Sequence, residues 1–249
     1  MAHLLIGSVI SALTLNACSK KDDDDDTVAA DTENFTLLGA GEGATALAAT
    51  PSIAKISVYQ FAVSENEDCS DATVVIDNGD TPQEFDMLES PEIGKGVIPD
   101  GTYPCVIMVM SPELTAAAGE DEGVCEKDKE FSQNVCGRGD DGSTVDLNGD
   151  EQECSSAEDK AYLYLSTLST LTDEYQDAEC HGEGITCNSF APPTDDNKAS
   201  GVPLGEALVV KGDESGVFTL GNLRTAEEGD EDDPTCGLQR PSFTFTPGS

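Results

Sequence analysis

Apolar residues recur along this chain in short runs bounded by Gly, Pro, Asp and Asn. The longest run, Ile53–Val63, is rich in β-branched and aromatic residues and apolar on both alternating faces, which predicts a central strand buried on both sides. A second strong run, Gly101–Met110, follows a turn at Pro99-Asp100-Gly101. Pro104 interrupts this run, and because proline cannot donate to a sheet ladder, it indicates a strand start or a sheet edge.

Shorter runs predict further strands. ALVV at 207–210 and GVFTL at 216–220 are separated by a polar turn and predict a hairpin. AYLYLSTL at 161–168 predicts a strand, with a helix reaching about Ala178 as the alternative. The remaining candidates are ATVVI at 72–76, EFDM at 84–87, FTF at 243–245 and FTLL at 35–38.

The number and spacing of these runs predict the fold class. No helical period persists and strands do not alternate with helices, so about eight to ten short strands predict a mainly β protein, an antiparallel β-sandwich. The stretch IPDGTYPCV (98–106) resembles a strand start in the prealbumin-like sandwiches of surface lipoproteins. We therefore expect an Ig-like or a prealbumin-like sandwich.

Composition divides the chain into three parts. Residues 1–17 are predicted to be a signal peptide, residues 18–50 an acidic flexible tether, and residues 51–249 a single sandwich domain. Within that domain, residues 111–160 are rich in Gly, Asp, Glu and Cys, and apolar runs vanish. We expect a long, acidic, disulfide-held loop insertion there, and loops of this length often carry function.

The first 18 residues contain the most specific motif. Leu4–Leu15 is uncharged, but its twelve residues fall short of the ~20 that a membrane-spanning helix needs. The run fits the apolar core of a signal peptide. Leu15-Asn16-Ala17-Cys18 then resembles the lipobox of bacterial lipoproteins. The resemblance implies cleavage before Cys18 and lipid attachment to it; an ordinary secretory signal with an incidental cysteine is the alternative.

An acidic run follows the lipobox. Lys20-Lys21 and Asp22–Asp26 resemble the export signal that carries Bacteroidota lipoproteins to the cell surface. Ser19, standing where an Asp would resemble an inner-membrane retention signal, favours the outer membrane. These resemblances imply an exported, lipid-anchored outer-membrane protein that faces the cell surface, with the membrane as its partner through Cys18. A plain charged spacer is the alternative for the aspartates.

The cysteine count agrees with export. Nine cysteines leave eight if Cys18 carries lipid, enough for four disulfides in an oxidising compartment. The close C-x2–4-C pairs that zinc sites favour are absent from the sequence. A preference for local pairs gives Cys69 with Cys105, Cys125 with Cys136, Cys180 with Cys187, and Cys154 with Cys236.

Charge narrows the range of partners. Acidic residues outnumber basic ones by 50 to 12, giving a net charge of −38. Such a polyanion repels nucleic acid phosphates, so we expect no nucleic acid partner. The absence of Trp argues against a large surface for stacking glycans. An extracellular or periplasmic protein or glycan ligand remains open.

One acidic segment suggests a cofactor. Asp146, Asn148 and Asp150 place oxygen atoms at alternate positions, as calcium loops do, and Glu153 follows. The positions that an EF-hand reserves for Gly and Glu are not matched, so any calcium loop here is of another type. Asp140-Asp141 would add ligands. The alternative is a solvated acidic loop, with no cofactor at all.

Catalytic motifs are scarce. The chain after Cys18 has a single histidine, His181, and neither a G-x-S-x-G elbow nor a phosphate-binding loop occurs. Arg138-Gly139-Asp140 spells the integrin tripeptide, which chance readily produces in a Gly- and Asp-rich segment. We therefore expect a non-enzymatic binding or structural module. Two alternatives stay open: a glycan-active hydrolase that uses two carboxylates, and a calcium-dependent adhesin.

Overall fold

The computed structural model describes residues 32–43, 50–136, 142–170, 188–228, 234–238 and 241–248. These residues form β-strands and one short 3-10 helix, η1 (Met87–Glu89), so the chain is mainly β, as the sequence predicts. Within these ranges, no helix is both long enough and apolar enough to cross a membrane.

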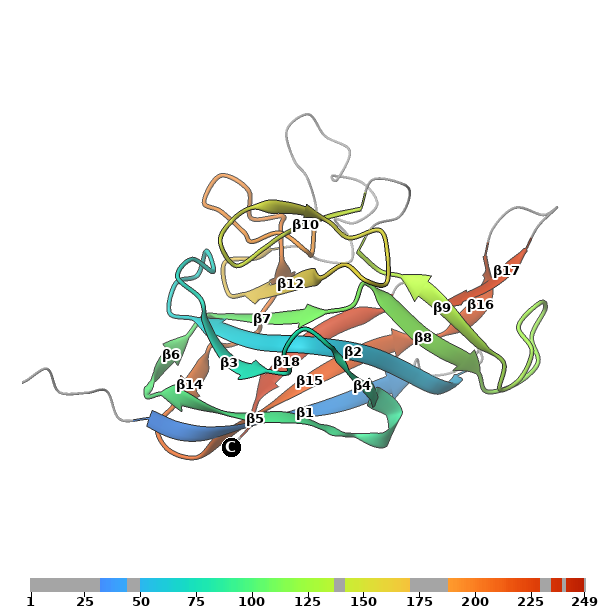
Figure 1. The fold of residues 1–249 in the computed structure, drawn as a ribbon, viewed down its shortest axis with the longest axis horizontal. Coiled ribbons are helices and arrows are strands. Elements are labelled where there is room, and N and C mark those ends of the chain that lie inside the picture. The colour runs from blue at the N-terminus through green and yellow to red at the C-terminus, as the bar shows by residue number, and fades with distance from the viewer. Residues whose placement is uncertain are drawn as a thin grey trace, which may run out of the picture.

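One layer is a four-stranded sheet (Figure 1). Its strands, in spatial order, are β18 (Ser242–Pro247), β15 (Glu214–Leu223), β1 (Thr32–Gly43) and β5 (Glu92–Pro99). β1 lies between a parallel neighbour, β15, and an antiparallel neighbour, β5. The sheet is therefore mixed rather than purely antiparallel.

The second layer is an eight-stranded sheet. Its strands are β2 (Pro51–Ser64), β3 (Thr73–Asp77), β4 (Gln83–Asp86), β7 (Cys105–Met110), β8 (Glu113–Ala118), β9 (Glu130–Asn134), β12 (Ala161–Ser166) and β13 (Val202–Pro203). β7 and β8 follow one another along one edge of β2, and β3 and β4 follow one another along its other edge. β2 is thus the central strand, as Ile53–Val63 predicts.

Three two-stranded pairs complete the described structure. They are β6 (Gly101–Tyr103) with β14 (Leu208–Val210), β10 (Ser143–Val145) with β11 (Glu151–Glu153), and β16 (Thr225–Glu228) with β17 (Thr235–Leu238). In Figure 1, β10 lies at the top of the molecule beyond β12, and β16 and β17 project from one end.

The two sheets enclose a core with stacked phenylalanines at its centre. Phe61 of β2 stacks on Phe35 of β1, with ring centroids 5.5 Å apart, and on Phe245 of β18, at 5.7 Å. All three rings are buried. Because Phe61 comes from the large sheet and the other two from the small one, this stack joins the layers, as in a β-sandwich.

Several predicted strands are found, but their partners differ from expectation. Gly101–Met110 is divided at Pro104 into β6 and β7, which is consistent with the missing donor of proline. The predicted hairpin between 207–210 and 216–220 is wrong: β14 pairs with β6, and β15 pairs with β1 and β18. Residues 161–166 form a strand, and the helix considered as far as Ala178 falls largely outside the described residues.

Two predicted boundaries also need correction. The structure places β1 inside the segment predicted as tether (18–50), because Phe35 and Leu37 are fully buried in the core. The sandwich therefore begins before residue 51. The predicted loop at 111–160 contains β8, whose alanines at 116–118 are buried in the large sheet, and β9 beside it. The remainder of 111–160 that is described holds the short β10–β11 hairpin.

Two glycines let the sheets approach each other at one edge. Gly94 and Gly96 of β5 face β3, so that a Cβ atom at Gly94 would lie 2.7 Å from Ile76 Cγ2 and one at Gly96 would overlap the Val75 carbonyl oxygen. The first neighbour is a side chain that can rotate, but the second is backbone. Only glycine fits at Gly96 without displacing a strand.

We predict that Gly96→Ala destabilises the fold by about 1–3 kcal/mol, because the added methyl group forces β3 and β5 apart. Equilibrium unfolding in urea measures the change. Gly205→Ala is the matched control, since no atom lies within 4 Å of the place that its added methyl group would occupy, and it is expected to stay within about 0.5 kcal/mol of the parent. Equal stabilities for the two variants would contradict the close approach.

Candidate functional site

The predicted calcium loop is the turn of the β10–β11 hairpin. Asp146 Oδ1 accepts hydrogen bonds from the backbone N–H groups of Asn148 (2.8 Å) and Asp150 (3.0 Å). The Asp146 backbone N–H also donates to the Asp150 carbonyl at 2.9 Å, and Gly149 adopts a positive φ of 86°. The alternating polar residues therefore build a tight turn in which the first carboxylate serves the backbone.

The same residues do not form a metal-binding cluster. Across the described ranges, no three His, Cys, Asp or Glu side chains gather in a way that would hold a metal ion. Asp146, Asp150 and Glu153 are all within those ranges, and Glu153 lies on β11, past the turn. Asp140 and Asp141, the further ligands considered, lie outside the described residues. Calcium binding stays a prediction from the sequence.

A buried tyrosine fixes this hairpin to the large sheet. The Tyr164 hydroxyl donates to the carbonyl oxygens of Val145 (2.8 Å) and Asp146 (3.0 Å). Burial, reinforced by the charge of Asp146, raises the pKa of the Tyr164 phenol and keeps it a donor. Buried Thr144 adds a second link, because its hydroxyl donates to the Phe190 carbonyl at 3.0 Å and accepts from the Tyr162 N–H at 2.9 Å.

This hairpin belongs to a third layer over the outer face of the large sheet. Tyr59, Ile107 and Val109 form a second apolar cluster there, with Leu147 of the hairpin turn packed against it. The disulfide Cys69–Cys105 joins the loop after β2 to the same cluster. The loop region at 142–153 thus acts as a cover that is attached to the sheet by specific hydrogen bonds.

We predict that Tyr164→Phe loosens the cover without unfolding the sandwich. Two partly buried carbonyl oxygens lose the hydroxyl that they share as donor, which costs about 1 kcal/mol. Hydrogen exchange should speed up at the backbone amides of 143–153, while exchange in β2 and β7 stays close to that of the parent. Tyr162→Phe is the comparison, because Tyr162 is only partly buried. Uniform loss of protection in all strands would contradict this assignment.

The disulfides agree with the sequence in one pair and correct two others. Cys69–Cys105 is confirmed. The predicted pairs Cys125–Cys136 and Cys154–Cys236 are wrong, because the structure pairs Cys125 with Cys236 and Cys136 with Cys154. Cys125 follows β8 and Cys236 lies on β17, so strand packing brings together residues 111 positions apart. Cys180 and Cys187 lie outside the described residues.

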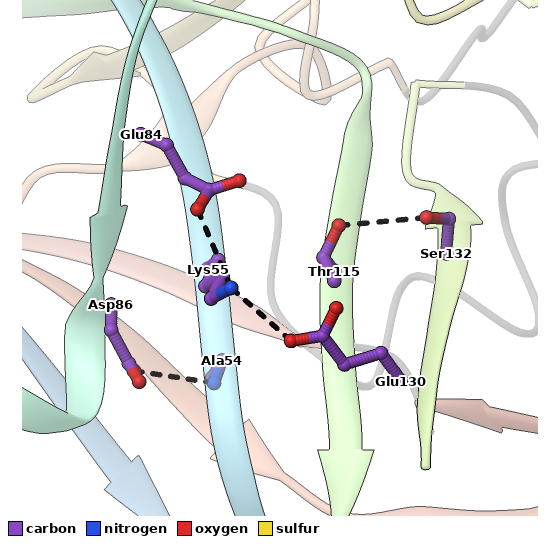
Figure 2. A network of polar contacts seen from close by, with 7 residues as sticks. All are labelled: Ala54, Lys55, Glu84, Asp86, Thr115, Glu130 and Ser132. Carbon is purple, nitrogen blue, oxygen red and sulfur yellow. Dashed lines mark hydrogen bonds and ion pairs between the residues drawn. The ribbon is translucent and has the colours of Figure 1, made fainter.

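A polar network that the sequence analysis missed lies on the outer face of the large sheet (Figure 2). Lys55 of β2 forms ion pairs with Glu84 of β4 at 3.4 Å and with Glu130 of β9 at 3.2 Å. Its side chain is 26% exposed. Beside it, Asp86 Oδ1 accepts from the N–H groups of Ala54 (3.3 Å) and Leu88 (3.1 Å). The network ties together strands that are separate in sequence.

The electrostatics of Lys55 indicate a structural role. Its hydrogen bond to Glu130 and then the charge of Glu84 raise the pKa of the Lys55 ammonium. A lysine that acts as a nucleophile or base needs the opposite shift. A signal for this residue was present in the sequence: Lys55 is the one charged residue in the apolar run Ile53–Val63. A cation inside a central strand has to find partners on neighbouring strands.

We predict that Lys55→Gln lowers the melting temperature most at low salt, because Glu84 and Glu130 then repel each other unscreened. Folding raises the pKa of Lys55, so its ion pairs stabilise the folded state fully below the unfolded lysine pKa of about 10.4. This stabilisation is lost as the pH rises through the raised value. Melting curves across pH and salt test this. Lys129 forms an exposed ion pair with Glu126, so Lys129→Gln should lower the melting temperature less. Equal shifts in melting temperature for the two variants would contradict the network.

The other candidate groups from the sequence cannot be located in the described ranges. His181 and Arg138-Gly139-Asp140 lie outside the described residues. A general acid of a glycosidase needs a raised pKa. In contrast, the hydroxyl and amide of Ser70 lower the pKa of Asp68, and the Gly79 amide lowers that of Asp77.

Comparisons of this chain with protein-family models, with curated proteins and with solved structures gave no match. The function is therefore argued from the residues themselves.

Proposed function

We propose that this chain is an exported lipoprotein, held in the outer membrane through lipid on Cys18 and facing the cell surface, whose β-sandwich is a non-enzymatic binding or structural module. The proposed localisation rests on the lipobox-like Leu15–Cys18 and the acidic run Asp22–Asp26. The sandwich is the basis for the module.

The disulfides are the observation that carries the proposal. Cysteines persist as disulfides mainly in exported proteins, and the three described bonds each involve buried cysteine. Cys125–Cys236 links segments 111 residues apart and so restricts a large part of the unfolded chain. A chain kept in a reducing cytoplasm would lose this stabilisation. The bonds therefore support export, which the lipobox requires.

The start of β1 limits how far the domain can lie from the lipid on Cys18. The sandwich begins at Thr32, so residues 19–31 separate it from Cys18. At 3.3–3.6 Å for each extended residue, they span at most about 45 Å. The strong negative charge of the chain opposes contact with anionic lipid head groups. The proposal therefore has the domain standing off the membrane, with its partner outside the lipid layer.

The described acidic groups favour a module over an enzyme. Asp146 holds a turn, Asp86 caps η1, and Glu84 and Glu130 hold Lys55. Each of these carboxylates already serves the fold. The hydrolase and adhesin alternatives would need carboxylates directed at a sugar or a calcium ion, and no specific contact among the described residues favours either one.

We predict that Cys18→Ser abolishes lipid attachment and releases the chain from the membrane. Growth with a labelled fatty acid, followed by membrane fractionation, measures both effects. Ser19→Ala is the matched control and should retain label and membrane association. A labelled, membrane-bound Cys18→Ser variant would contradict lipidation at this residue. Replacing Asp22–Asp26 with Asn tests export to the cell surface separately. The lipid label should stay, while cleavage of the chain by protease added to intact cells should fall.

A further inference from the structure

The sequence contains two Asn-Gly pairs, Asn78-Gly79 and Asn148-Gly149, and each is followed by Asp. Asn-Gly is the dipeptide at which asparagine loses its side-chain amide most readily, because glycine has no side chain to hinder attack by its own backbone nitrogen. The two sites share the reacting residues and the residue after them. A large difference in their reactivity therefore has to come from the structure around them.

Asn78 is held to the central strand β2 by two hydrogen bonds. Its backbone N–H donates to the Tyr59 carbonyl oxygen at 2.8 Å, and its side-chain Nδ2 donates to the Val58 carbonyl oxygen at 3.1 Å. The Gly79 N–H, which is the group that would attack, donates to the Asp77 carboxylate at 2.8 Å. A neighbouring carboxylate opposes the loss of that amide proton. Both reacting groups are therefore restrained at this site.

Asn148 lies in the turn between β10 and β11, where it and Gly149 are exposed. Within the described ranges, the Asn148 side chain makes no hydrogen bond, and its backbone N–H donates to Asp146 Oδ1. The Gly149 N–H donates to the Asp146 carbonyl oxygen at 3.0 Å, which is a neutral group. β10 and β11 pair over three residues each, and so short an exposed hairpin opens more readily than the central strand.

We propose that Asn148 is a site of spontaneous deamidation and that the fold protects Asn78 from the same reaction. The Gly149 nitrogen attacks the Asn148 side-chain carbon Cγ, and the bond from Cγ to Nδ2 breaks. Nδ2 leaves as ammonia together with the Gly149 amide proton, and a succinimide ring remains. Water opens this ring at either of its two carbonyl carbons.

The two ring openings give different products at position 148. One leaves an ordinary aspartate. The other leaves isoaspartate, in which the backbone runs through the former side-chain carbon. The whole reaction consumes one water molecule, releases one ammonia molecule, and needs no oxidant or reductant. The modification goes beyond the proposed lipoprotein function and does not depend on the anchor.

The products alter the turn that attaches the cover. Isoaspartate adds a methylene group to the backbone, and the hydrogen bonds that Asp146 accepts from the N–H groups of Gly149 and Asp150 both span the inserted group. Either product also adds a negative charge beside Asp146 and Asp150, which repel it. Leu147, the preceding residue, packs against the apolar cluster beneath the cover. We therefore expect the cover at 142–153 to loosen as the protein ages.

Incubation of the purified chain bearing Cys18→Ser at mildly alkaline pH tests the proposal, because the attacking amide has to lose its proton. Peptide mapping by mass spectrometry follows deamidation at each Asn-Gly pair, and electron-transfer fragmentation distinguishes isoaspartate from aspartate. We expect Asn148 to deamidate at least about tenfold faster than Asn78, since Asn78 first has to break two hydrogen bonds to β2. Equal rates in the folded chain, or a faster reaction at Asn78, would overturn the proposal.

The same chain, reduced and unfolded in urea, is the matched control for local sequence. There the two rates should become similar, because only the restraints of the fold have been removed. A difference between Asn148 and Asn78 that persists unchanged in urea would also overturn the proposal, since the fold would then not be its cause.

Asn148→Gln tests the effect on the cover, because glutamine would have to close a larger ring and reacts far more slowly. Fresh samples of the variant and the parent should show the same circular dichroism and the same hydrogen exchange. After incubation, the backbone amides of 143–153 should exchange faster in the parent but not in Asn148→Gln, while those of β2 and β7 stay unchanged in both. Unchanged exchange at 143–153 in a deamidated parent would contradict the loosening.

Discussion

The fold depends on the insertion of β1 between β15 and β5. This strand supplies Phe35, which stacks on Phe61 of the opposite sheet, and Leu37, which is also fully buried. Its backbone pairs on both edges, so it carries two sets of ladder hydrogen bonds. Without β1 the small sheet would be divided into β5 on one side and β15 with β18 on the other. The core between the sheets therefore requires β1.

The sequence predicted strands far better than it predicted their partners. Ile53–Val63 reads as a central strand because hydrophobicity on both faces is a local property. The pairing of β14 with β6, or of Cys125 with Cys236, joins residues about a hundred positions apart and leaves no mark on local composition. The preference for local pairs therefore gave Cys69–Cys105 correctly and exchanged the partners of Cys125 and Cys154.

The candidate site shows the same limit. Alternating polar residues at 146–150 are compatible with both a calcium loop and a tight turn. The hydrogen bonds of Asp146 show that the backbone forms the turn, while calcium binding stays a prediction. The misplacement of β1 has a related cause: FTLL at 35–38 is a candidate strand, but the segment that follows it is rich in Gly and Ala and resembles a linker, so the whole stretch falls within the predicted tether. The charge of −38, in contrast, is a sum over all residues and needs no structure to be read.

The place of β1 also determines how the domain bears mechanical load. A pull on the residues before Thr32 acts along the axis of β1, because the chain enters the sandwich at the start of that strand. Hydrogen bonds to β15 and β5 lie across this direction, so the pull shears both ladders at once instead of opening them one bond at a time. Under the proposed anchorage, traction on the residues before Thr32 would therefore be opposed by two ladders and a buried aromatic stack together.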